Sequence, residues 1–182
     1  MNEKIIDYFF KNAEKGNWSD VSIGELSKKL KVKEEKIRKE IPSKEYFLVS
    51  YNNYLDEKVL QEVSNEDLEN SQPDEVLQEY LMLKLEFMSK YKLAIANIIN
   101  SSLTNHNFIL LSLKYHKKSI QKFVNKISFQ KNLIKKNILI KLVLGLWLIA
   151  FKKWLYDDDN SEAAYSFIDM GIKRIKKSLK VF

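Results

Sequence analysis

Two histidines and one acidic run are the residues whose types could support catalysis or metal binding. His106 and His116 lie ten positions apart across a polar break, with no carboxylates at ligand spacing around them. A histidine-based triad or a zinc site needs several such groups brought together. The acidic run Asp157–Asp159 is typical of a solvated loop and helix cap. There is no glycine-rich phosphate loop either, so we expect no enzymatic activity, no metal and no cofactor.

A short predicted helix, Lys33–Glu40, carries side chains that could bind phosphate. Its four basic residues are accompanied by Glu34, Glu35 and Glu40, which leaves a net charge of +1. Because release of counterions supplies much of the affinity for DNA, these acids offset a large part of it. A glutamate can instead accept a hydrogen bond from cytosine, or complement the dipole at a helix N-terminus. Both interpretations stay open at the level of sequence.

The composition is typical of a soluble globular protein, with 45% hydrophobic and 30% charged residues in a chain of 182. The absence of Cys excludes a disulfide framework and fits a reducing compartment, so we expect a cytoplasmic protein. Glu3 and Asp7 interrupt the first apolar residues, which argues against a signal peptide. The most apolar run, Ile138–Phe151, is 14 residues long and contains Lys141, so we expect a buried helix.

The formal net charge of +7 is distributed unevenly along the chain. Residues 1–60 contain 12 basic and 11 acidic side chains, and residues 61–89 contain 8 acids with Lys84 as the one basic residue. Residues 90–140 contain 10 lysines and no acid. The basic surplus therefore lies in the second half of the chain and not in the segment that could contact DNA.

Apolar positions recur at helical spacing along almost the whole chain, which predicts an all-α fold. Ser22 and Glu25 have the spacing of a capping box, and Pro42-Ser43 marks a helix boundary with Ser43 as the N-cap. The polar stretch Ser64–Asp74 is the best candidate for a junction between a head and a body. The predicted helices are Glu3–Lys15, one following Ser22, Lys33–Glu40, 44–62, Asp74–Asn100, Phe108–His116, Lys118–Lys126, Asn132–Tyr156 and Glu162–Val181.

The segment Ile5–Asn53, above all "VSIGELSKKLKVKEEKIRKEIPSKEYFL", resembles the head of TetR family transcriptional regulators. This resemblance implies a three-helix helix-turn-helix head over 1–50 and a larger helical-bundle body over 51–182, which binds ligand and dimerises. The linker helix would span about 44–62. It also implies that the third helix enters the major groove of double-stranded DNA. The DNA-binding residues would be Lys33, Lys36, Arg38 and Lys39, with Lys44 near a phosphate.

The same segment departs from the family pattern at several positions. Lys31 stands where the family usually has a glycine in the turn, and Glu35-Lys36 replaces a common pair of small residues. Arg38 stands where a tyrosine often contacts phosphate. Lys39-Glu40 stands where the family has an Arg or His pair.

Aromatic and apolar residues of the predicted body could line a cavity with polar tips from the tyrosines. The resemblance implies a cavity of this kind for a small apolar or aromatic ligand. Packing in the core is the alternative for each residue taken singly. The candidate residues are Tyr80, Phe87, Met88, Tyr91, Phe108, Leu111, Tyr115, Phe123 and Trp147.

The helix around Ile138–Phe151 is apolar nearly all round, so it needs cover on a second side. A second copy of the chain is a natural cover, and we predict a homodimer that pairs this helix with the final one. The expected interface residues are Leu142, Leu146, Ile149, Phe167 and Met170.

A weaker resemblance links Trp154–Ile172 to ubiquinone-biosynthesis lipid-binding proteins, which share the TetR fold without reading DNA. Gly171–Phe182 is a basic amphipathic segment that could lie on an anionic membrane, or form a dimer helix with a solvated lysine face. The leading functional prediction is a ligand-responsive, dimeric TetR-type regulator, most simply a repressor. The alternative is a lipid- or quinone-binding accessory protein with a peripheral membrane contact through its basic C-terminal body.

Overall fold

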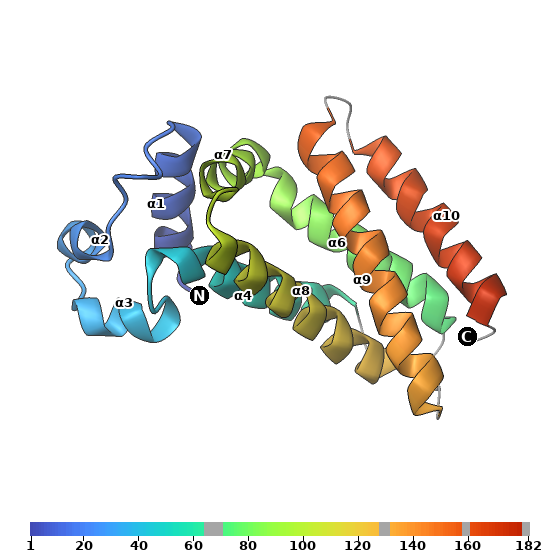
Figure 1. The fold of residues 1–182 in the computed structure, drawn as a ribbon. Coiled ribbons are helices and arrows are strands. Elements are labelled where there is room, and N and C mark those ends of the chain that lie inside the picture. Colours follow the sequence, from blue (N-terminus) through green and yellow to red (C-terminus); the bar gives the residue numbers. More distant parts are fainter. Residues whose placement is uncertain (64–70, 128–131, 158–160, 180–182) are drawn as a thin grey trace. The chain divides into compact units, whose positions relative to one another are not determined.

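The computed structural model describes residues 1–63, 71–127, 132–157 and 161–179 (Figure 1). Within these ranges the chain forms helices and no strand, which confirms the predicted all-α class. The elements are α1 (Glu3–Glu14), α2 (Ile23–Leu30), α3 (Glu34–Glu40), a 3-10 turn η1 (Lys44–Tyr46), α4 (Phe47–Glu62), α6 (Pro73–Ser89), α7 (Lys92–Ser102), α8 (His106–Ile127), α9 (Leu133–Tyr156) and α10 (Glu162–Leu179). The predicted junction 64–74 and the acidic run Asp157–Asp159 lie largely outside the described residues.

Two predicted helix boundaries in the middle of the chain are wrong. The helix predicted over Asp74–Asn100 is broken between α6 and α7, because Tyr91 leaves the helical conformation and packs on α1. Its ring stacks on Phe10 at 4.2 Å between centroids, and its hydroxyl donates to Asp7 at 2.8 Å. The break predicted near Lys117 is absent, since no Gly or Pro interrupts this part of the single helix α8.

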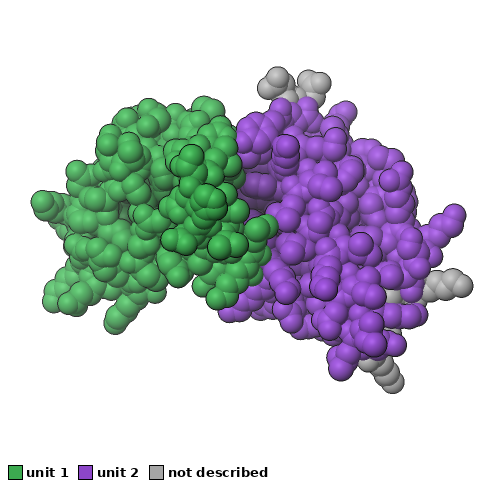
Figure 2. Space-filling view, in the orientation of Figure 1, with its two compact units in different colours: residues 1–54, 90–115 green, residues 55–89, 116–182 purple. Residues whose placement is uncertain are grey.

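The chain divides into two compact units, coloured green and purple in Figure 2. Unit 1 comprises residues 1–54 and 90–115, and unit 2 comprises residues 55–89 and 116–182. Helices α4 and α8 are each divided between the two units. Unit 1 thus contains the predicted head together with a later segment, and the predicted division at residue 50 stays a prediction.

Aromatic side chains form the core of unit 1. Phe9 stacks on Phe47 at 4.3 Å between ring centroids, and Trp18 lies 6.0 Å from Phe9. Helix α1 buries the apolar face that its spacing predicts, and Asn97 of α7 donates to the Ala13 carbonyl at 2.9 Å. Burial of large rings of this kind is the main source of stability for a small helical unit.

A short turn, with Lys31 in it, joins α2 to α3. The Ser22 hydroxyl accepts from the Glu25 amide at 3.1 Å, which confirms the predicted cap of α2. Lys31 closes α2 in the left-handed conformation, with φ 53° and ψ 39°. The Ser43 cap is wrong in its chemistry, because the Ser43 hydroxyl bonds the Glu45 carboxylate and caps no backbone amide.

Helices α9 and α10 lie side by side in unit 2 (Figure 1). Gly171 allows their close approach, since a Cβ at this position would overlap the Leu146 side chain. Lys176 of α10 donates to both carboxylate oxygens of Asp74 at 2.9 and 2.8 Å, which ties α10 to α6. Among the described helices, none is both long enough and apolar enough to span a lipid bilayer.

Replacement of Lys31 by Gly is expected to stabilise the protein by roughly 0.5–1 kcal/mol. A side chain in the left-handed region costs about 1–2 kcal/mol, and the greater freedom of Gly in the unfolded chain offsets part of the gain. Urea unfolding followed by circular dichroism measures the change. The control is Lys28→Gly inside α2, which should destabilise by about 0.5–1 kcal/mol. Destabilisation by both changes would contradict the role assigned to the turn.

Candidate functional site

The exposed face of α3 carries the cations predicted to contact DNA. Lys33, Lys36, Arg38 and Lys39 are all exposed, while Ile37 is buried and anchors the helix in unit 1. Ile37 therefore faces the core of unit 1, and the four cations face solvent, as the apolar spacing predicts. Whether these side chains contact DNA stays a prediction.

Arg38 is held by contacts within the head. Its Nε and Nη2 atoms donate to Glu34 Oε1 at 2.8 and 2.5 Å, and Nη1 donates to the Pro42 carbonyl at 3.0 Å. Glu34 thus pairs with Arg38 one helical turn away. A phosphate that approaches Arg38 would have to exchange with this carboxylate.

Lys44 is also occupied by neighbouring groups. Its ammonium donates to the carbonyls of Trp18 and Ser19 at 3.0 and 2.8 Å, and it lies 5.4 Å from the centroid of the Trp18 ring. These contacts fasten η1 to the connector between α1 and α2. Two of the five cations predicted to meet DNA, Arg38 and Lys44, therefore have structural roles.

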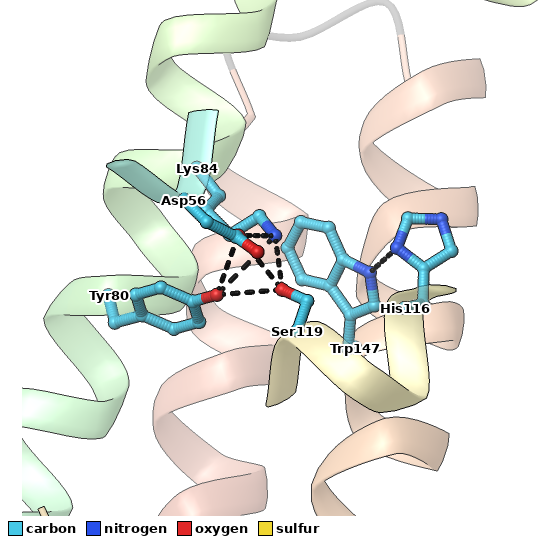
Figure 3. A network of polar contacts seen from close by, with 6 residues as sticks. All are labelled: Asp56, Tyr80, Lys84, His116, Ser119 and Trp147. Carbon is cyan, nitrogen blue, oxygen red and sulfur yellow. Dashed lines mark hydrogen bonds and ion pairs between the residues drawn. The ribbon is translucent and has the colours of Figure 1, made fainter. Parts of the chain in front are cut away.

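A buried polar cluster lies in unit 2, formed by Asp56 of α4, Tyr80 and Lys84 of α6, and Ser119 of α8 (Figure 3). One oxygen of Asp56, Oδ1, accepts from Lys84 Nζ at 2.6 Å and from the Tyr80 and Ser119 hydroxyls, both at 2.8 Å. Lys84 Nζ also donates to Ser119 Oγ at 3.0 Å. Three donors from two helices, α6 and α8, thus converge on one carboxylate oxygen of α4.

Burial and charge set the protonation of this cluster. Burial lowers the pKa of the Lys84 ammonium, and the adjacent Asp56 carboxylate opposes that change. Burial, reinforced by the Asp56 charge, raises the pKa of the Tyr80 phenol well above its usual value. Tyr80 therefore keeps its proton and serves as a donor to Asp56.

His116 extends the polar region toward α9. Its Nδ1 accepts from Trp147 Nε1 at 3.2 Å (Figure 3). Burial, together with the positive charge of Lys84, lowers the pKa of His116 to about 4. The imidazole is therefore neutral near pH 7, as an acceptor at Nδ1 requires.

A cavity of about 150 Å³ adjoins this cluster in unit 2. A more open groove of about 380 Å³ lies on the outer face of α6 and beside Tyr165. Its other lining residues are Glu75, Gln78, Glu79, Met82, Leu83 and Glu86. The residues that line the smaller cavity are Asp56, Leu60, Tyr80, Ser119, Lys122, Phe123 and Lys126.

The predicted ligand-binding residues are divided between the two units. Tyr80 and Phe123, stacked at 3.7 Å, line the smaller cavity, and Trp147 is buried with its ring centroid 5.3 Å from Lys84 Nζ. Phe87 is half-buried and Met88 is buried on α6. The residues that belong to unit 1 are Tyr91, Phe108, Leu111 and Tyr115.

The predicted dimer residues also differ in exposure. Leu142, Ile149 and Met170 are 42%, 50% and 47% exposed, which leaves them accessible to a second copy. Leu146 is buried against Gly171 inside the protomer, and Phe167 is half-buried with Lys153 Nζ 5.6 Å from its ring centroid.

The amphipathic C-terminal segment has its apolar side directed into unit 2. Ile172 and Ile175 are buried, and Leu179 is half-buried. Phe182 lies outside the described residues. The membrane contact predicted from this segment stays a prediction, and the described part of its apolar face is already packed.

Sequence reasoning missed Asp56, Lys84 and Ser119 as members of a site. One signal was available, because Lys84 lies four residues after Tyr80, at core spacing on the buried face of α6. A lone lysine in such a position requires a buried anion. The sequence does not say which of many acids supplies that charge.

No protein-family model and no curated protein sequence matches the chain. Among solved structures, the chain is similar to a TetR transcriptional regulator from Nitrosomonas europaea, with a TM-score of 0.75. The two share 16% sequence identity, and the alignment covers 96% of this chain and 97% of that chain. The chain therefore has the fold of that regulator, as the resemblance of the head implied.

Single substitutions of the buried pair, Asp56→Asn or Lys84→Met, are each expected to cost about 3–5 kcal/mol of unfolding free energy. Each leaves a buried charge without its counter-ion. The double variant should cost less than the sum by at least about 2 kcal/mol, because neither charge then remains. Urea unfolding of the four proteins measures the coupling.

The matched control is the exposed pair Asp169 and Lys173 on α10, whose charged atoms are 2.8 Å apart. Asp169→Asn and Lys173→Met should couple by less than about 0.5 kcal/mol, because water screens this pair. An equal coupling in the two cycles would contradict the importance assigned to burial of Asp56 and Lys84.

Proposed function

We propose that this protein is a ligand-responsive TetR-type transcriptional regulator that binds operator DNA as a homodimer. The observation that carries this proposal is a fold shared with a TetR regulator over nearly the whole chain. A formed turn between α2 and α3 supports it, as do the exposed ammonium groups of Lys33, Lys36 and Lys39. In this function α3 enters the major groove of the operator.

Ligand response follows from a difference in affinity between two arrangements of the dimer. One arrangement of the dimer spans the operator and the other does not. A ligand in unit 2 that binds the second arrangement more tightly increases its population. DNA is then released, so the regulator acts as a repressor. The effect on DNA affinity and the effect of DNA on ligand affinity must be equal in free energy.

The proposed dimer interface is an apolar stripe on the exposed face of α9. Ile138, Leu142, Ile149 and Tyr156 are 40–53% exposed, and their spacings of four and seven residues place them on one side of the helix. Met170 on α10 is exposed as well. Exposed apolar stripes of this kind mark protein–protein contacts, and a second copy of the chain would remove this one from water.

A second function is favoured by the internal contacts of Arg38 and Lys44. In it, the fold is kept without DNA binding, and the protein is a lipid- or quinone-binding accessory factor. Glu34, the Pro42 carbonyl and the carbonyls of Trp18 and Ser19 occupy groups that a DNA-binding head would offer to phosphates. Direct measurement of DNA binding separates the two functions.

Selection from a random duplex library is expected to enrich one pseudopalindromic sequence. Lys36→Gln combined with Lys39→Gln should weaken its binding and reduce the slope of log affinity against log salt by about four, because the dimer loses two phosphate contacts in each protomer. Fluorescence anisotropy over a range of salt concentrations measures both quantities. The control, Lys117→Gln with Lys118→Gln, removes the same charge from exposed positions of α8. No enrichment, or an equal loss in the control, would leave the accessory function in its place.

Ile149→Lys is expected to convert a dimer into a monomer, because it places a charge at the centre of the proposed apolar interface. Sedimentation equilibrium at micromolar concentration measures the mass. The control is Leu110→Lys, since Leu110 is 66% exposed on α8 and belongs to unit 1, and this variant should remain dimeric. A monomeric unsubstituted protein would refute the proposed interface.

A further inference from the structure

The cavity of about 150 Å³ in unit 2 has three chemically distinct parts. Asp56, Tyr80 and Ser119 form its polar end, and they belong to the buried cluster. Leu60 and Phe123 supply apolar wall. Lys122 and Lys126 line it as exposed residues, so their ammonium groups can reach solvent.

The volume limits the size of a ligand. Cavities that hold drug-sized molecules measure about 300–1,000 Å³, whereas one of about 150 Å³ accepts a molecule the size of benzene. One ring, or an apolar body of similar size, therefore fits here. Larger polycyclic ligands do not fit within it.

The charges around the cavity favour an anion. Asp56 is compensated by Lys84, whose Nζ lies 2.6 Å from Oδ1. Lys122 and Lys126 then leave a surplus of two positive charges among the lining residues. They lie four residues apart on α8, hence on one side of the helix, and can both approach one carboxylate.

The buried end of the cavity fixes the orientation of such a ligand. The Asp56–Lys84 pair leaves no net positive charge there to attract an anion, and the Tyr80 and Ser119 hydroxyls already donate to Asp56. A ligand carboxylate is therefore directed outward to Lys122 and Lys126. Its ring is left against Leu60 and Phe123, where burial of apolar surface adds affinity.

We propose that this cavity binds a small aromatic monocarboxylate, held by Lys122 and Lys126 through its acid group and by Leu60 and Phe123 through its ring. The proposal deepens the ligand response described above and rests on it for regulatory meaning. The binding of the ligand itself is argued from the cavity alone and does not require that the protein be a regulator. The two can therefore fail separately.

The test is calorimetric titration of the full chain with benzoate and with its neutral isostere benzamide. Benzoate should bind about tenfold more tightly, because only the carboxylate forms charge-assisted bonds with the two lysines. The preference should fall as salt is raised. Equal affinities for the two probes, or no binding of benzoate at millimolar concentration, would overturn the proposal.

Lys122→Gln combined with Lys126→Gln should remove the preference for benzoate and leave benzamide binding within about twofold of its original value. Both residues are exposed, so the variant is expected to fold. The matched control is Lys173→Gln with Lys177→Gln, which makes the same charge change at the same four-residue spacing on exposed positions of α10, a helix with no residue among those that line the cavity. Loss of the preference in the control as well would show a general charge effect and overturn the assignment.

The same proteins separate this proposal from the regulatory function. Benzoate that binds through Lys122 and Lys126, in a protein that selects no DNA sequence, upholds the site and rejects the regulator. A protein that selects an operator but shows no preference for benzoate over benzamide upholds the regulator and rejects this ligand class.

Discussion

The Asp56 carboxylate is the group on which the interior of unit 2 depends. It lies 6% exposed, and one of its oxygens receives hydrogen bonds from Tyr80, Lys84 and Ser119. A carboxylate in such a place is tolerated only when its charge is compensated and its acceptors are used. Those donors come from α6 and α8, so the requirement holds α4, α6 and α8 in one arrangement. The cavity beside Asp56 is a consequence of that arrangement.

The polar cluster and the cavity form one electrostatic system. Lys84 neutralises Asp56 inside, while Lys122 and Lys126 stay near water. The inner charges therefore cancel, while the two outer charges remain exposed. Trp147 has its ring centroid 5.3 Å from Lys84 Nζ and donates to His116 Nδ1, a hydrogen bond that requires a neutral imidazole. The inner charges thus have a structural role, and recognition of a ligand is the role proposed for the two outer lysines.

The head in unit 1 uses charge in a different way. Glu34 satisfies Arg38 on the surface of α3, and backbone carbonyls satisfy Lys44. A phosphate must displace these partners before it can reach Arg38 or Lys44. Lys33, Lys36 and Lys39 consequently carry most of the proposed attraction for DNA.

The sequence alone determined the helical class, the cap at Ser22, the buried face of α1 and the apolar character of α9, because each depends on local spacing and capping chemistry. It also contained the pattern of the head. Only the tertiary structure decided the break before α7, since Tyr91 leaves the helix to meet Phe10 and Asp7 from the other end of the chain. Tertiary structure likewise chose Asp56 as the counter-ion of Lys84, 28 residues away, and brought Ser119 to both. Pairings of this kind depend on which helices pack together, and the spacing of residues within a single helix does not predict its neighbours.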